Sequence, residues 1–184
     1  MRKIQRLSSL PKYIYQGRTN DCGPSALAMA LTSLLATPPN PSEVNRRLRP
    51  WRVPFVGATL PWGVIAVARS FGVKADGHWL GRIGEIERAI DRGRAPVVIV
   101  HPDDFGVTPF FTLHYRVVVG YEKTGLEEQD GRLYFACSAL PERELFGESD
   151  GLARPGNLAL DYRNFLRQWH TYLTILFWAE LSGE

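Results

Sequence analysis

Apolar residues recur at helical spacing through the first half of the chain. After Gly23 they fall three and four positions apart, on one face of a helix, and Pro38-Pro39 ends this run. Asn40 then reads as an N-cap, with Pro41 at the first helical position and Glu43 as the glutamate of a capping box. Together with this second helix, which ends near residue 48, the pattern predicts two more, over residues 59–71 and 83–92.

The second half of the chain changes to short runs rich in β-branched and aromatic residues. Such runs favour strands, here predicted over residues 96–100, 115–121, 132–137 and 172–179. Residues 122–131 are predicted as a turn, 140–157 as a loop, and 161–169 as a short helix. Helices first and antiparallel strands later indicate an α+β fold.

Composition limits the number of domains and the classes of partner but does not identify a function. A length of 184 residues fits one domain, and a 45% share of hydrophobic residues allows a sizeable core. The net charge of +3 comes from scattered basic residues, so no nucleic-acid partner is expected. The N-terminus has no apolar run suited to a signal peptide, and no apolar stretch is long enough to span a membrane. We therefore expect a soluble, cytoplasmic protein with no membrane partner.

The chain has two cysteines, Cys22 and Cys137, which do not make a disulfide framework. No metal-ligand spacing is present, and no metal or cofactor is expected. Cys22 lies where a loop meets the first predicted helix, with Asp21 as its N-cap. Backbone N–H groups and the helix dipole would favour a reactive thiolate there, whereas the Asp21 charge opposes it. The ordinary alternative is a buried structural thiol.

Two other residues could complete a thiol site. Gln16 lies six positions before Cys22, and its side-chain amide could donate to an oxyanion beside the Cys22 backbone N–H. His114 opens the predicted strand 115–121, from which an imidazole could reach a helix start packed on the sheet. His101 ends another strand and is the competing base, while His78 and His170 lie in stretches that read as loops.

The combination of Gln-x-x-x-x-Asp-Cys-Gly-Pro with His-Tyr-x-Val-Val-x-Gly-Tyr, about ninety residues later, resembles the C39 and C39-like peptidases of the papain-like superfamily. The resemblance extends over residues 13–170 and includes Phe165 and Trp169 of a late segment. It implies one papain-like domain over residues 1–184, with a helical N-terminal part packed on a C-terminal antiparallel sheet. It also implies that Cys22 is the nucleophile, His114 the general base and later acid, and Gln16 the oxyanion donor.

The chain departs from this family at one position. The family places an acid or amide after the strand that follows the histidine strand, where it orients the imidazole. Here Cys137 or Ser138 falls at that place, and Ser138 could accept a hydrogen bond from the ring. Glu122 and Asp130 are the nearest acids in sequence, and both are expected to face solvent from the turn. The sequence leaves open whether Cys137 or Ser138 takes the orienting role.

Three functions fit these residues. The first is a cysteine peptidase that forms a thioester acyl-enzyme at Cys22 and acts on a peptide or protein, for example a leader peptide. An amine acceptor in place of water would make the same residues an acyltransferase. The third is a peptide-binding module with weak or lost catalysis, which the missing acid favours and the retained Gln16, Cys22 and His114 oppose. The sequence does not decide the cleavage specificity or the oligomeric state.

Overall fold

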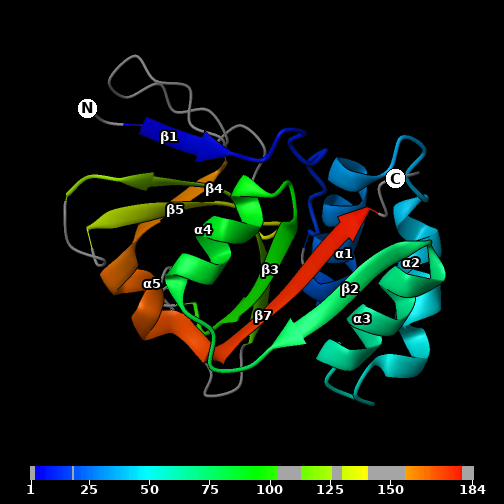
Figure 1. Cartoon of the computed structure of the whole chain (residues 1–184). Helices are drawn as coiled ribbons and strands as arrows, with labels where there is room; N and C mark the ends of the chain where they lie inside the picture. Colours follow the sequence, from blue (N-terminus) through cyan, green and yellow to red (C-terminus); the bar gives the residue numbers. More distant parts are fainter. Residues whose placement is uncertain (1–2, 18, 103–112, 126–129, 141–155, 180–184) are drawn as a thin grey trace.

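The computed structural model describes residues 3–17, 19–102, 113–125, 130–140 and 156–179. It confirms an α+β fold in which the first helices pack against an antiparallel sheet (Figure 1). The elements in chain order are β1 (Lys3–Arg6), α1 (Cys22–Leu34), α2 (Pro41–Leu48), the 3₁₀ turn η1 (Arg49–Trp51), α3 (Pro61–Ser70), β2 (Val73–His78), α4 (Ile83–Asp91), β3 (Ala95–Val100), β4 (His114–Lys123), β5 (Gly131–Ala136), β6 (Leu158–Asp161), α5 (Tyr162–Gln168) and β7 (Trp169–Ala179).

The sheet has the strand order β2-β7-β3-β4-β5-β6, and every pairing is antiparallel. β4 is long enough to change neighbours along its length. Its first residues pair with β3, whereas its last residues pair with β1 and with β5. β3 lies between β7 and β4 in the sheet. The end of β3 is therefore beside the starts of both neighbours, since Val100 pairs with His114 of β4 and with Trp169 of β7.

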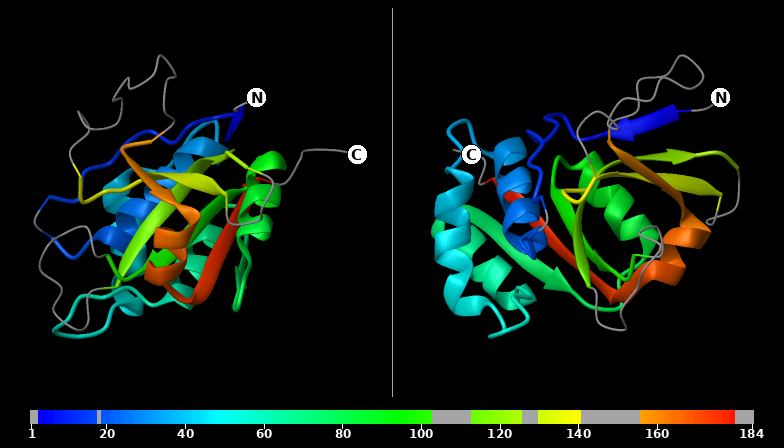
Figure 2. Two further views of the ribbon diagram at one scale, coloured as in Figure 1. Left: turned by 90° about the vertical axis from the view of Figure 1, so that its left-hand side faces the viewer. Right: turned by 180° about the vertical axis from the view of Figure 1, so that it is seen from behind.

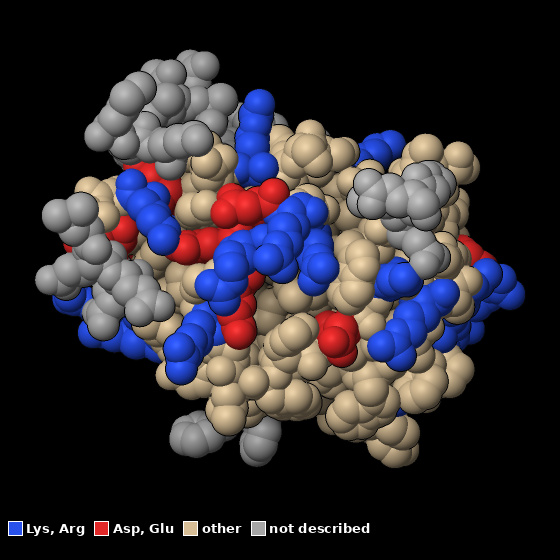
Figure 3. All heavy atoms as spheres, viewed as in Figure 1, with Lys and Arg blue, Asp and Glu red and all other residues tan. Residues whose placement is uncertain are grey.

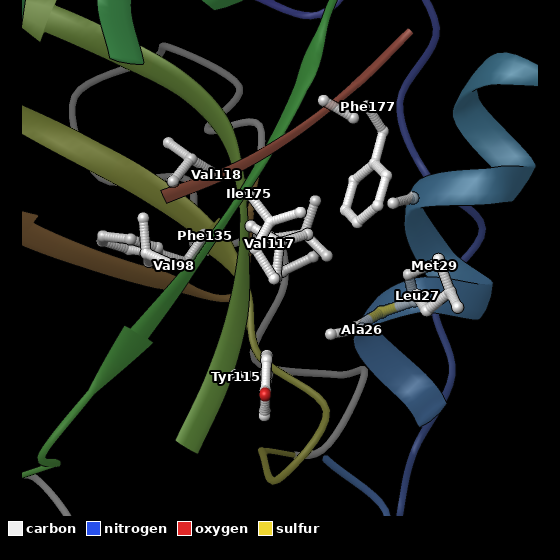
Figure 4. Close-up of a cluster of buried hydrophobic side chains, with 14 of the residues drawn as sticks. Ala26, Leu27, Met29, Val98, Tyr115, Val117, Val118, Phe135, Ile175 and Phe177 are labelled. Carbon is white, nitrogen blue, oxygen red and sulfur yellow. The ribbon is translucent and has the colours of Figure 1, made fainter. Parts of the chain in front are cut away.

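The main core lies between α1 and the sheet. Residues 23–31 of α1 are all buried, so this helix is covered on every side, as its small and apolar sequence allows. Val117, Ile175 and Phe177 face α1, while Val98, Val118 and Phe135 lie on the other side of the strands (Figure 4). Seen from behind, α1 to α3 form one side of the molecule, with α4 and α5 beyond the strands (Figure 2).

Helix boundaries agree with the sequence pattern to within two residues. Asn40 caps α2 by accepting a hydrogen bond from the backbone N–H of Ser42, as expected, and Pro41 opens the helix. Glu43 is not the acceptor of a capping box, because its carboxylate contacts Arg46 and Arg47 one turn later. The side chain thus stabilises the helix surface rather than its first N–H groups.

Three strands were not expected. β1 and β6 are short and are defined by pairing with β4 and β5, a long-range contact that no local pattern reveals. β2 places His78 in a strand, and β7 begins at residue 169, so His170 also lies in a strand. The prediction that these two histidines lie in loops was therefore wrong. Most of the predicted loop 140–157 lies outside the described residues.

The surface drawn in Figure 3 mixes charges. Over α4, basic side chains lie beside acidic ones, and a further group of basic side chains lies at the right-hand edge. Within the described ranges, no helix has the length and apolar character needed to cross a bilayer. The same residues contain no cluster of three or more histidine, cysteine or acidic side chains that could hold a metal ion.

Candidate active site

Cys22 is the first residue of α1, as the sequence predicted. Its half-buried thiol is close to β4, because the backbone N–H of Tyr115 hydrogen-bonds to it, as does that of Gly23. The residue after Cys22 is a glycine because there is no room for a side chain at that position. A Cβ on Gly23 would lie 2.7 Å from the Cβ of Thr59, so a side chain there would push the loop before α3 away from the helix start.

Burial raises the pKa of the Cys22 thiol above its ordinary value. Hydrogen bonds from the backbone N–H groups of Tyr115, Gly23 and Cys22 itself lower this pKa, and the nearby Cys137 thiol raises it further. The helix start therefore does not by itself produce a thiolate. An ionised Cys22 would need a cationic partner.

Asp21 occupies the N-cap position but does not cap the helix with its side chain. Its carboxylate instead pairs with the Arg52 guanidinium at 2.7 Å. Arg52 also donates to the carbonyl oxygens of Asn20 at 3.0 Å and Gly57 at 2.9 Å, and so joins two loops beside Cys22. The arginine offsets the negative charge that would otherwise oppose a thiolate at residue 22.

His114 is the first residue of β4 and is 6% exposed. Its Nε2 lies 3.4 Å from the Sγ of Cys137, a fully buried side chain. Because the Tyr115 N–H reaches the Cys22 thiol, His114 and Cys22 lie at the same strand end. Tyr115 also fixes this end of β4 by donating its hydroxyl to the Thr59 carbonyl oxygen at 2.7 Å.

Gln16 lies beside the start of α1 and is held at three points. Its backbone N–H donates to the Ser138 carbonyl oxygen at 2.9 Å. Its side-chain Nε2 donates to the Thr19 carbonyl oxygen at 3.0 Å, and its Oε1 accepts from the Ser138 hydroxyl at 2.6 Å. The glutamine is thus tied to the end of β5 as well as to the loop that leads to Cys22.

The two residues after β5 therefore contact different partners. Cys137 contacts the imidazole of His114, whereas the Ser138 hydroxyl hydrogen-bonds to Gln16. The two nearest acids take no part in these contacts. Asp130 is exposed, as expected, but Glu122 is fully buried and accepts a hydrogen bond from the Tyr134 hydroxyl at 2.7 Å. The expectation that Glu122 faces solvent was wrong, because β4 continues through it.

His101, the competing base, lies one residue beyond β3 and is exposed. Its Nε2 lies 2.8 Å from Nδ1 of His170, and the two rings meet edge to face. Burial, followed by the neighbouring His101, lowers the pKa of His170. His101 is thus engaged with another imidazole and not with the residues after β5.

Sequence reasoning missed two residues that hold this site together. Arg52 lies in an irregular loop, and only the folded chain shows that it reaches Asp21. Asn157 accepts from the Cys137 N–H and donates to the Cys137 carbonyl oxygen, both at 2.8 Å. Its position before a strand in a Gly/Pro-rich stretch gave no signal of this role.

No protein-family model matches the sequence, and no curated protein matches it either. Solved structures do match. A putative C39-like peptidase from Bacillus anthracis has a TM-score of 0.65 at 15% identity, covering 98% of this chain and 100% of the other. The peptidase domain of Streptococcus ComA, a bifunctional ABC transporter, has a TM-score of 0.59 at 15% identity, over 94% and 98% of the two chains.

A double-glycine motif protease from an AMS/PCAT transporter, solved in complex with its leader peptide, has a TM-score of 0.53 at 16% identity. It covers 97% of this chain and 100% of the other. At these identities the likeness concerns the fold, which spans nearly the whole of each chain. The papain-like fold of the C39 and C39-like peptidases is therefore the fold of this protein.

Proposed function

We propose that this chain is a cysteine peptidase that cleaves a peptide or related amide bond through Cys22 and His114. The observation that carries the proposal is the position of the Cys22 thiol. It lies at the start of α1, against the Tyr115 N–H and at the strand end occupied by His114, in the fold of known peptidase domains. Gln16 supplies the third group, a side-chain amide beside the helix start.

The chemistry follows from the groups present. The Cys22 proton passes to His114, and the thiolate sulfur bonds to the substrate carbonyl carbon. The backbone N–H of Cys22 and the amide N–H of Gln16 stabilise the oxyanion. His114 then protonates the departing amine as the carbon–nitrogen bond breaks, which leaves a thioester. Water attacks that thioester, His114 takes its proton, and the acid product leaves with Cys22 restored.

A peptide is the substrate class that matches the fold of the known peptidase domains. A cavity of about 210 Å³ lies on the Gln16 side of α1, with Tyr15, Gln16, Asp21 and Asn45 in its wall. On the loop that Arg52 holds, Phe55 and Val56 are exposed, which gives an apolar surface for a substrate side chain. A leader peptide is one candidate, since one protein of the same fold was solved with such a peptide.

Two free thiols suit a reducing compartment, and we propose the cytoplasm as the site of action. The same residues with an amine acceptor would transfer the acyl group instead of hydrolysing it. A binding module with weak catalysis is the second candidate. It is favoured by the raised pKa of Cys22 and by a thiol at Cys137, where a carboxylate would hold His114 more firmly.

Labelling with a peptidyl thiol electrophile tests the proposal. The wild-type chain should be labelled at Cys22, and Cys22→Ala should not be labelled. A panel of peptides that includes double-glycine leaders is then incubated with wild type, Cys22→Ala and His114→Ala, and the product masses are measured. Hydrolysis that both variants abolish supports the peptidase. Aminolysis products identify an acyltransferase. Unchanged peptide affinity in all three proteins without any product favours the binding module.

A further inference from the structure

The two residues that follow β5 are held firmly in place by their backbone. Asn157 bonds to both the N–H and the carbonyl oxygen of Cys137, and its own N–H donates to the Phe135 carbonyl oxygen at 3.0 Å. The Ser138 carbonyl oxygen accepts the Gln16 N–H. Both side chains are fully buried. Hydrogen bonds to Asn157 and Gln16 therefore hold the backbone of this segment in place.

The Cys137 sulfur contacts a particular nitrogen of His114. A sulfur is a weak acceptor, and at 3.4 Å from Nε2 it can accept an N–H from that nitrogen. A proton on Nε2 leaves the lone pair of the neutral ring on Nδ1. That nitrogen is then the one that can accept the proton of Cys22. An acceptor at residue 137 thus favours the tautomer in which Nε2 carries the proton.

The Ser138 hydroxyl orients the amide of Gln16. The Thr19 carbonyl oxygen can only accept a hydrogen bond, so the amide nitrogen must face it, and Oε1 must face Ser138. This arrangement uses one N–H of the amide on Thr19. The second N–H is the one that can donate to an oxyanion at Cys22.

We propose that Cys137 and Ser138 are paired positioning residues: Cys137 orients the His114 base through Nε2, and Ser138 orients the Gln16 oxyanion donor through Oε1. The inference rests on the peptidase function proposed above. The sequence offered these residues as alternatives for one role, whereas the structure assigns each its own role. One short segment after β5 thereby sets the geometry of both halves of the site.

The Cys137 half is tested on the titration of His114, which needs no substrate. In a Cys22→Ala background, the His114 pKa is measured by NMR. The protein with the native Cys137 is compared with the variants Cys137→Ala, Cys137→Asn and Cys137→Asp. A carboxylate at hydrogen-bonding distance stabilises the imidazolium, so Cys137→Asp should raise the His114 pKa by about one unit or more. The alanine and asparagine variants should not raise it in this way.

Thermal unfolding shows which of these variants fold, and Cys137→Asn serves as the second folded comparison. With Cys22 restored, Cys137→Asp should also increase the rate of Cys22 alkylation at pH 6–7 by about tenfold, because the thiolate–imidazolium pair is favoured. A folded Cys137→Asp chain whose His114 pKa and Cys22 alkylation match those of wild type would overturn the assignment. This result is independent of whether any peptide is cleaved.

The Ser138 half is tested by a double-mutant cycle with Gln16 on a cleaved peptide. Ser138→Ala should lower kcat about tenfold with KM within about twofold, since complete loss of an oxyanion donor costs about 10²–10³ in kcat. In a Gln16→Ala background the same change should have no further effect. Thr174→Val, which removes another buried hydroxyl, is the matched control and should leave kcat unchanged. Equal losses from Ser138→Ala with and without Gln16 would overturn this half while leaving the peptidase function intact.

Discussion

Two histidine environments at one end of the sheet differ in burial and in partner. His114 is buried and contacts the Cys137 sulfur, whereas His101 is exposed and contacts the imidazole of His170. Both residues adjoin strand ends that are paired through Val100. A strand-end position therefore does not distinguish a base from a surface histidine. The two residues differ instead in burial and in the buried partner that only His114 has of the two, which is why we propose His114 as the base.

The largest expected difference between His114 and His101 is in the peptide cleavage that remains when each is replaced. His114→Ala removes the proposed base and should lower kcat/KM by about 10³-fold or more, as Cys22→Ala should. His101→Ala leaves the residues around Cys22 in place and should retain activity within about threefold of wild type. Steady-state kinetics on one cleaved peptide measure all three variants. An equal loss in His101→Ala would assign the base to the His101–His170 pair.

Alkylation of Cys22 gives the next largest contrast. Burial raises the pKa of this thiol, so without an imidazolium partner it stays protonated at neutral pH. His114→Ala should therefore slow iodoacetamide labelling of Cys22 at pH 7 by at least about tenfold, and the rate should recover only in alkaline solution. Peptide mass spectrometry at a series of pH values measures this rate. The His101→Ala profile should coincide with that of wild type, and coincidence of the His114→Ala profile would reject the pair.

The ion pair between Arg52 and Asp21 should have a smaller effect on the buried site. Arg52→Gln leaves the Asp21 carboxylate without its guanidinium and loosens two loops, so Cys22 labelling at pH 7 should slow about two- to fivefold. Adding Asp21→Asn should restore most of the rate, because the opposing charge is gone. Arg46→Gln, in an exposed pair on α2, is the matched control and should change nothing. Failure of the double variant to recover would indicate that Arg52 acts through loop structure instead of charge.

The sequence revealed the parts of this site that have local signals. Cys22 could be placed at a helix start because apolar periodicity begins there, and His114 at a strand start because β-branched residues follow. The Arg52–Asp21 pair could not be found, since it joins residues thirty-one positions apart through an irregular loop. The separate partners of Cys137 and Ser138 depend on which way each side chain turns after β5. The backbone of Cys137 is held by Asn157 and the Ser138 hydroxyl by Gln16, and both partners are distant in sequence.

The His101–His170 pair should show the smallest effect, a pH dependence confined to mildly acidic solution. In this pair, His101 Nε2 lies 2.8 Å from His170 Nδ1. His170 has a lowered pKa in the folded chain, which means that the folded state binds fewer protons than the unfolded state. The stabilising contribution is therefore present above the ordinary histidine pKa of about 6.5 and is lost as the pH falls through the folded value.

His101→Gln removes the neighbouring charge, so the His170 pKa should rise toward its ordinary value, and the fall in stability between pH 7 and 5 should become shallower. NMR titration of His170 and urea unfolding at each pH measure the two quantities. An unchanged His170 pKa in His101→Gln would show that burial alone sets it.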